Sequence, residues 1–75
     1  MTFVDIVAEV LELDPEEVDD AGSPATLHSW TSLRHLQLVV TLEEVYGLSF
    51  SRNEIKSFSS VGQIRATLQT KGVTL

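Results

Sequence analysis

The chain has 75 residues, of which 43% are hydrophobic and 21% charged, a composition typical of one folded domain over residues 1–75. It has no cysteine, which excludes disulfides and thiolate metal sites, and no metal site is expected. Its formal net charge is −6, and the first 20 positions hold eight acidic residues and no basic one, which argues against a nucleic-acid partner.

The first half of the chain predicts a helix, a short helical turn and a long loop. Apolar residues recur at helical spacing over residues 3–13, with Thr2 placed to cap the helix. Asp14-Pro15-Glu16-Glu17 combines a cap residue with a proline suited to the first helical position, so we expect one short turn there. Residues 19–29 have little periodicity and predict a loop, which Leu27 attaches to the core.

The second half predicts three helices. The longest covers residues 32–46 and is closed by Gly47, since glycine adopts the left-handed conformation at little cost. Ser51-Arg52-Asn53-Glu54 has the spacing of a capping box and opens a short helix. The last helix opens at Ser60 and ends at Lys71. The expected fold class is therefore all-α, a small bundle of three main helices and one or two short ones.

The helix over residues 32–46 is apolar on two sides. Leu33, Leu36 and Val40 gather on one side, next to Ser32. A helix with two apolar sides either lies centrally in its bundle or binds a partner, and the pattern leaves both possibilities open for Leu36. The opposite, broader side is expected to face the core and consists of Leu38, Val39, Leu42, Val45 and Tyr46.

Several short motifs resemble, in order and spacing, those of acyl carrier proteins. Thr31-Ser32-Leu33 is similar to the family's Asp-Ser-Leu. The segment over residues 42–47, Leu-Glu-Glu-Val-Tyr-Gly, is similar to its Leu-Glu-Glu followed by an aromatic residue and glycine. Val61-Gly62 with Ile64 is similar to the opening of its last helix. The resemblance extends over essentially the whole chain and implies an acyl-carrier-like domain.

The resemblance implies a role for Ser32, which on its own would be interpreted as a helix N-cap. A magnesium-dependent phosphopantetheinyl transferase would attach 4′-phosphopantetheine from coenzyme A to its hydroxyl. Acyl or related carboxylic units would then be held as thioesters on the terminal thiol of the arm. The chain would have no catalytic residue and would not be an enzyme, because activation of the hydroxyl belongs to the transferase.

The expected partners are the transferase and the enzymes that load and accept the acyl unit. Arg34, His35 and Gln37 stand in a stretch where the family commonly has acids, and Thr31 replaces its aspartate. Trp30-x-Ser32-Leu33-x-His35 resembles discrete carriers of specialised metabolism, including polyketide-type pathways. The alternatives are a helical adaptor without a carrier function and a housekeeping fatty-acid carrier. The predicted partner-binding residues are Leu33, Arg34, Leu36, Gln37, Val40, Glu43 and Glu44.

Trp30 precedes a helix and is expected to pack against its first turn or the loop, with contact to the arm as the alternative. His28 and His35 are expected to have structural roles, because no carboxylate has a convincing spacing for a catalytic pair or a metal site. The N-terminus lacks the basic segment of a signal peptide, and no run approaches the roughly 18 apolar residues of a membrane span. We therefore expect a cytoplasmic monomer with no membrane partner. Because the chain starts at Met1 and ends soon after the last helix, a free-standing protein is expected.

Overall fold

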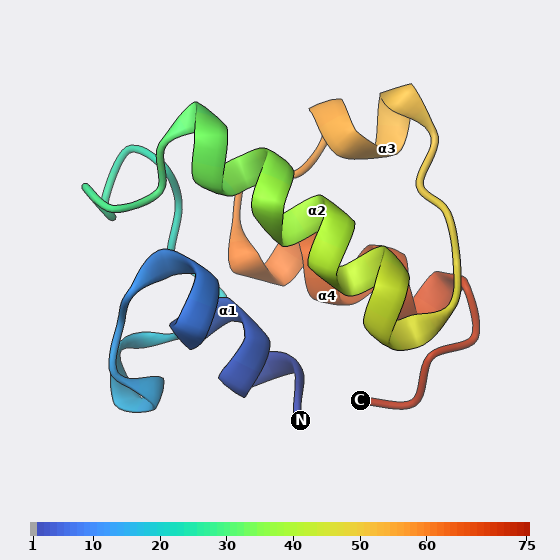
Figure 1. The fold of residues 1–75 in the computed structure, drawn as a ribbon, viewed down its shortest axis with the longest axis horizontal. Helices are drawn as coiled ribbons and strands as arrows, with labels where there is room; N and C mark the ends of the chain where they lie inside the picture. The colour runs from blue at the N-terminus through green and yellow to red at the C-terminus, as the bar shows by residue number, and fades with distance from the viewer. Residues whose placement is uncertain (1) are drawn as a thin grey trace.

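The computed structural model describes residues 2–75, so Met1, the first residue of the predicted domain, lies outside the described part. Within that part the secondary structure is entirely helical, which confirms the all-α prediction (Figure 1). Three main helices and two short ones follow one another as α1 (Phe3–Leu11), η1 (Pro15–Glu17), α2 (Ser32–Tyr46), α3 (Arg52–Lys56) and α4 (Val61–Thr70).

Polar side chains define where the helices begin. The Thr2 hydroxyl accepts a hydrogen bond from the Asp5 N–H and caps α1, as predicted. In α3 the predicted capping box is present, because Ser51 Oγ accepts from the Glu54 N–H at 3.1 Å while Glu54 Oε1 accepts from the Ser51 N–H at 2.8 Å. Ser60 caps α4 in the same way as Thr2 caps α1. Local sequence therefore sets these boundaries.

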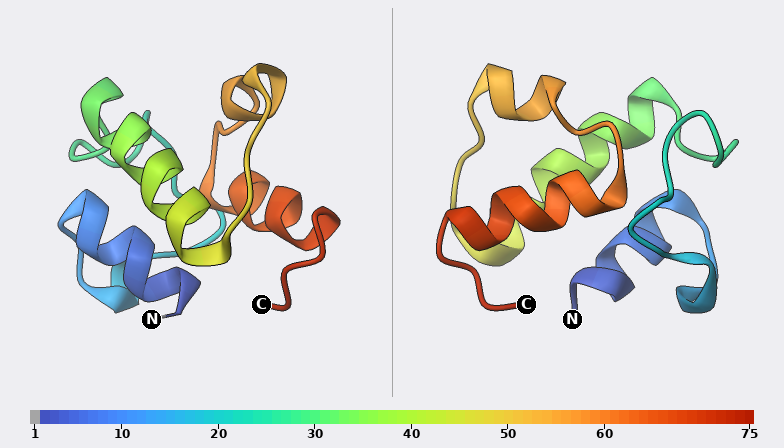
Figure 2. Two further views of the ribbon diagram at one scale, coloured as in Figure 1. Left: turned by 45° about the vertical axis from the view of Figure 1, so that its right-hand side comes forward. Right: turned by 180° about the vertical axis from the view of Figure 1, so that it is seen from behind.

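The helix α2 lies centrally, with α1 and α3 on either side of it and α4 behind it (Figures 1 and 2). Its buried residues Leu38, Val39 and Leu42 meet the apolar faces of α1 and α4. The predicted face of α4 is confirmed, since Val61, Ile64 and Leu68 are fully buried. The core as a whole comprises Phe3, Ile6, Val7, Leu11, Trp30, Leu38, Val39, Leu42, Phe50, Phe58, Val61, Ile64 and Leu68.

The long loop between η1 and α2 is tied to the beginning of α4. The Val61 N–H donates to the Gly22 carbonyl oxygen at 2.9 Å, and the Gly62 N–H donates to that of Asp20 at 3.1 Å. A side chain at Gly62 would place its Cβ only 3.1 Å from the Asp20 oxygen, so glycine permits this approach. Leu27 packs against the core, as predicted. The loop that leads into α2 is therefore held at both ends.

The prediction for the core side of α2 is wrong at Val45, which is 46% exposed. Tyr46 is partly buried, whereas Leu38, Val39 and Leu42 are buried as predicted. Gly47 ends the helix in the left-handed conformation, with φ of 64°, as predicted. In the last turn of α2, Tyr46 thus packs against the core whereas Val45 remains in solvent.

Candidate functional site

The N-terminus of α2 presents two neighbouring hydroxyl side chains with different environments. Thr31 is the N-cap residue, and its Oγ1 accepts a hydrogen bond from the Arg34 N–H at 3.3 Å. Ser32 is the first helical residue, and its exposed hydroxyl makes no hydrogen bond to any of residues 2–75. The interpretation of Ser32 as a simple N-cap is therefore wrong, because Thr31 performs that function.

The other serines near a helix start or in the same loop have different environments. Ser51 and Ser60 cap α3 and α4. Ser29 precedes Ser32 by three residues, but its Oγ is buried. The Ser32 hydroxyl, by contrast, is exposed on a well-defined helical turn and can be reached by a reagent or an enzyme.

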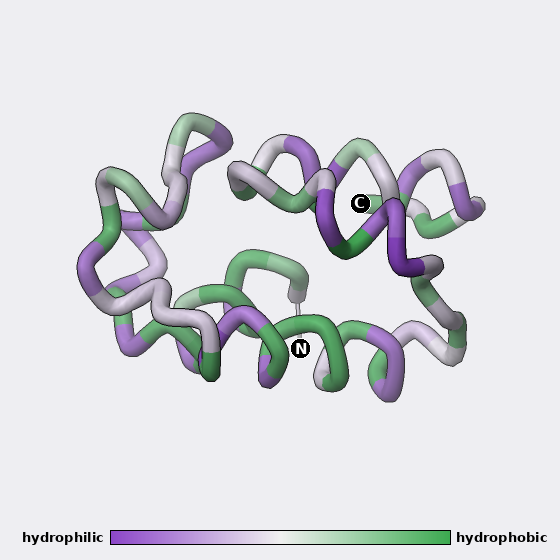
Figure 3. The backbone as a smooth tube through the Cα atoms, turned by 90° about the horizontal axis from the view of Figure 1, so that it is seen from above, coloured by the Kyte–Doolittle hydropathy of each residue, from purple (hydrophilic) through white to green (hydrophobic). Residues whose placement is uncertain are grey.

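The apolar residues beside Ser32 form an exposed stripe on α2, consisting of Leu33, Leu36 and Val40. Their exposed fractions are 66%, 58% and 51%. The alternative in which Leu36 belongs to the core is therefore wrong. Figure 3 shows hydrophobic positions recurring along α2, and the exposed ones add a surface that the core does not use. An exposed apolar surface next to a reactive group indicates contact with another molecule.

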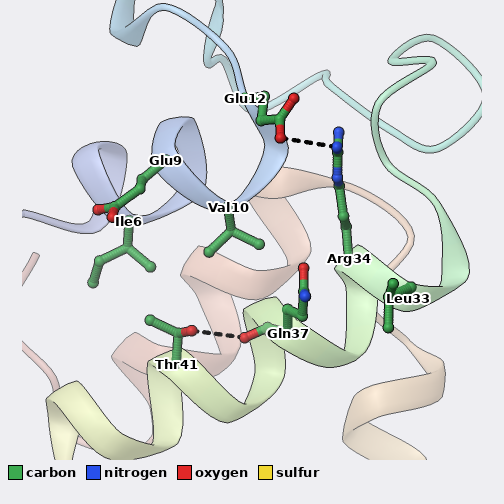
Figure 4. Close-up of a pocket in the computed structure, with 8 residues that line it drawn as sticks. All are labelled: Ile6, Glu9, Val10, Glu12, Leu33, Arg34, Gln37 and Thr41. Carbon is green, nitrogen blue, oxygen red and sulfur yellow. Dashed lines mark hydrogen bonds and ion pairs between the residues drawn. The ribbon is translucent and has the colours of Figure 1, made fainter.

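A groove of about 690 Å³ separates this end of α2 from α1 (Figure 4). Arg34 lies at one end of it, where its Nη2 is 3.0 Å from Glu12 Oε1 and its Nη1 donates to the Ser29 carbonyl oxygen at 3.3 Å. Arg34, predicted to bind a partner, thus also ties α2 to the end of α1 and to the preceding loop. The groove is lined by Ile6, Glu9, Val10, Glu12, Leu33, Arg34, Gln37 and Thr41.

The two acidic residues in the second half of α2 differ in their contacts. Glu43 Oε2 accepts a hydrogen bond from the Phe50 N–H at 2.8 Å, so this carboxylate holds the segment after α2 in place. Glu44 is exposed, and no ion pair or hydrogen bond of its side chain is found within residues 2–75. Sequence reasoning treated the pair alike, whereas the structure leaves only Glu44 fully available to a partner.

Buried Trp30 and partly buried His35 form a hydrogen-bonded pair next to Ser32. Trp30 Nε1 donates to His35 Nδ1 at 3.1 Å, and the two rings are stacked with centroids 6.0 Å apart. Because Nδ1 accepts, the ring proton of His35 is on Nε2, which faces the Ile55 carbonyl oxygen at 3.4 Å. This confirms the structural role predicted for His35. His28 is exposed in the loop.

The chemistry available at this site is that of a nucleophile without its own base. No side-chain base contacts the Ser32 hydroxyl, and no cluster of three metal-ligating side chains occurs in the described part of the chain. The first turn of α2 leaves the Ser32 and Leu33 N–H groups without an intrahelical acceptor, and such groups favour a phosphate. The start of α2 therefore suits a phosphate group next to Ser32.

A family model described as "Phosphopantetheine attachment site" matches residues 2–68. The match includes α1, η1, α2 and α3 and extends into α4. No curated protein matches the chain. No helix in residues 2–75 is long and apolar enough to cross a membrane.

Proposed function

The chain belongs to the phosphopantetheine attachment-site family, and on this premise we propose that Ser32 carries the 4′-phosphopantetheine group of an acyl-carrier-type protein. The observation that carries this proposal is the exposed, hydrogen-bond-free Ser32 hydroxyl at the start of α2, which is capped by Thr31 instead. The group, when bound, supplies a terminal thiol on which acyl units are held as thioesters. Residues 1–75 would form a single domain with this function.

The attachment step follows from the chemistry of the two groups. Ser32 Oγ forms a bond to the pantetheine-bearing phosphorus of coenzyme A, and the bond from that phosphorus to the bridging oxygen breaks. Adenosine bisphosphate leaves, and the hydroxyl proton passes to a base of the transferase, because no side-chain base within residues 2–75 contacts Ser32. The Ser32 and Leu33 N–H groups and the dipole of α2 then stabilise the negative phosphodiester.

The exposed stripe is proposed to contact the transferase and the enzymes that load and accept the acyl unit. An apolar helix face of this kind fits a groove on a partner, with anchors spaced along the helix. The exposed groups on and beside α2 include both charges. Glu44 on α2 is acidic and Gln37 is polar but neutral, while the neighbouring α3 presents exposed Arg52 and Lys56 (Figure 1). No ion pair of Arg52 or Lys56 is found within residues 2–75. A partner with both acidic and basic groups around an apolar centre fits best.

The chain is proposed to be a dedicated carrier in polyketide-type or other specialised metabolism. Thr31, Arg34 and Gln37 replace residues that are acidic in general carriers, which changes the charge pattern that a partner meets. Catalysis by the chain itself is not part of the proposal, because the site has a nucleophile but no general base. An adaptor without a carrier function would share the exposed stripe, but would give no reason for the family match.

Incubation with coenzyme A, magnesium and a broad-specificity phosphopantetheinyl transferase tests the carrier function. The intact mass should increase by one phosphopantetheinyl group, and the same mixture without transferase should leave it unchanged. If several transferases of different specificity all leave the mass unchanged, the chain does not act as a carrier.

A further inference from the structure

A second surface feature adjoins Ser32 and shares no lining residue with the α1–α2 groove. It is a pocket of about 290 Å³ that we call the Trp30 pocket. Ser32 itself lies at its edge, so a group attached to Ser32 begins at the mouth of this pocket. The pocket is lined by Pro24, Trp30, Thr31, Ser32 and His35.

The walls of the Trp30 pocket are fixed by contacts that extend into the core. Trp30 is only 4% exposed, and the hydrogen bond from its Nε1 to His35 Nδ1 holds the two rings at an interplanar angle of 23°. His35 in turn contacts the Ile55 carbonyl oxygen and lies 6.3 Å from the Phe58 ring. The pocket is therefore formed before any ligand arrives, which lowers the entropic cost of filling it.

Apart from the Ser32 hydroxyl, the polar side-chain atoms of these walls already make hydrogen bonds within the chain. The indole N–H and both imidazole nitrogens make contacts within the chain, and the Thr31 hydroxyl caps α2. Pro24 adds a ring without an N–H group. The pocket thus presents mainly carbon atoms to a ligand, and a compact apolar group fits it better than a charged one.

We propose that the Trp30 pocket receives the two methyl groups at the root of the phosphopantetheine arm. This inference rests on the proposed attachment at Ser32. In the arm, the carbon that bears both methyl groups is separated from the phosphorus by one oxygen and one methylene carbon. With the phosphate at the N–H groups of Ser32 and Leu33, this branched carbon lies next to the attachment point and can enter the pocket. The root of the arm is then held, while the distal thiol stays free.

The test is nuclear magnetic resonance of the loaded protein, labelled with carbon-13 and nitrogen-15 and carrying an unlabelled arm. Isotope-filtered spectra should show nuclear Overhauser effects between the two arm methyl groups and ring protons of Trp30 and Pro24. The indole N–H resonance of Trp30 should shift on loading. Full loading by mass without these effects, or with methyl contacts only to Leu36 or Ile55, would overturn the inference while leaving the carrier function intact.

A pair of matched variants tests whether these nuclear Overhauser effects arise in the Trp30 pocket. Pro24→Asp adds a charge to the apolar wall, and the methyl-to-Trp30 effects should weaken at least several-fold. Ala25→Asp adds the same charge to the next residue, which is exposed and does not line the pocket, and the effects should persist. Backbone amide spectra show whether each variant keeps the fold. Equal loss in both variants, or in neither, contradicts occupation of the Trp30 pocket.

Discussion

Thr31 rather than Ser32 is the N-cap residue of α2, and the two adjacent hydroxyls therefore have different roles. Thr31 Oγ1 accepts the Arg34 N–H hydrogen bond, whereas the Ser32 hydroxyl is exposed. Conversion of Ser32 to a phosphate ester consequently leaves the cap of α2 in place. A serine that had to cap the helix would lose its acceptor geometry when the bulky group was attached.

Replacement of Thr31 and of Ser32 tests whether Thr31 is the residue that caps α2. Thr31→Ala removes the cap, and the free energy of unfolding should fall by about 1 kcal/mol. Thr31→Ser keeps a hydroxyl that can cap the helix, and Ser32→Ala removes a hydroxyl that makes no hydrogen bond within residues 2–75. The free energy of unfolding of both variants should therefore lie within about 0.5 kcal/mol of that of the unchanged protein. Urea denaturation measures all three. A larger loss in Ser32→Ala than in Thr31→Ala would show that Ser32 caps the helix.

The exposed stripe should affect docking without affecting stability. Leu36→Glu places a charge on a side chain that is 58% exposed, so the stability should change by less than about 0.5 kcal/mol. The KM for loading by a transferase should rise, by about tenfold if about 1.4 kcal/mol of contact energy is lost. Val45→Glu is the matched control, because Val45 is an exposed apolar residue of α2 outside the stripe. Equal KM values in the two variants would contradict docking at the stripe.

Glu43 is expected to contribute to the stability of the fold, whereas Glu44 is expected to be a surface residue that does not. Glu43→Ala leaves the Phe50 N–H without its acceptor, and the free energy of unfolding should fall by about 1–3 kcal/mol. Glu44→Ala should change it by less than about 0.5 kcal/mol, because the side chain is exposed. Thermal or urea unfolding of the two variants gives the comparison. Identical stabilities would mean that the contact with Phe50 contributes nothing.

A pH-dependent contribution is expected from Glu54. The hydrogen bond from the Ser51 N–H, and then the contact with Lys71 at 3.0 Å, lower the pKa of this carboxyl from its ordinary value of 4.5. A lowered folded-state pKa gives stability that is present above the unfolded-state value and is lost as the pH falls through the folded-state value. Glu54→Gln should therefore be less stable than the unchanged protein at neutral pH, and the difference should shrink below pH 4.5. A difference that is independent of pH would contradict this.

The helices and their caps were predictable because local residues determine them. Thr2, Ser51 and Ser60 each cap the helix that the sequence assigned to them. The stripe on α2 was predictable from helical spacing, but its exposure was not, since the pattern could not show whether another helix covered Leu36. Val45 illustrates the same limit, because helical spacing does not show which residues of an apolar face the neighbouring elements cover.

The details of the site depend on contacts between distant residues, which spacing does not encode. Thr31 and Ser32 both suit an N-cap, and a shift of one residue in the helix start exchanges their roles. The contact of Glu43 with Phe50 requires the particular path of the chain after Gly47. The Trp30–His35 hydrogen bond likewise depends on how the loop enters α2, although a buried tryptophan generally indicates a partner for its N–H.

The most direct test of the account is to locate the attached group within the chain. After loading from coenzyme A, the protein is digested and the modified peptide is sequenced by tandem mass spectrometry, with Ser32→Ala and Ser29→Ala treated in parallel. We predict one phosphopantetheinyl group on Ser32, full loading of Ser29→Ala and none of Ser32→Ala. A group found on another residue, or loading of Ser32→Ala to the same extent as the unchanged protein, would contradict the account.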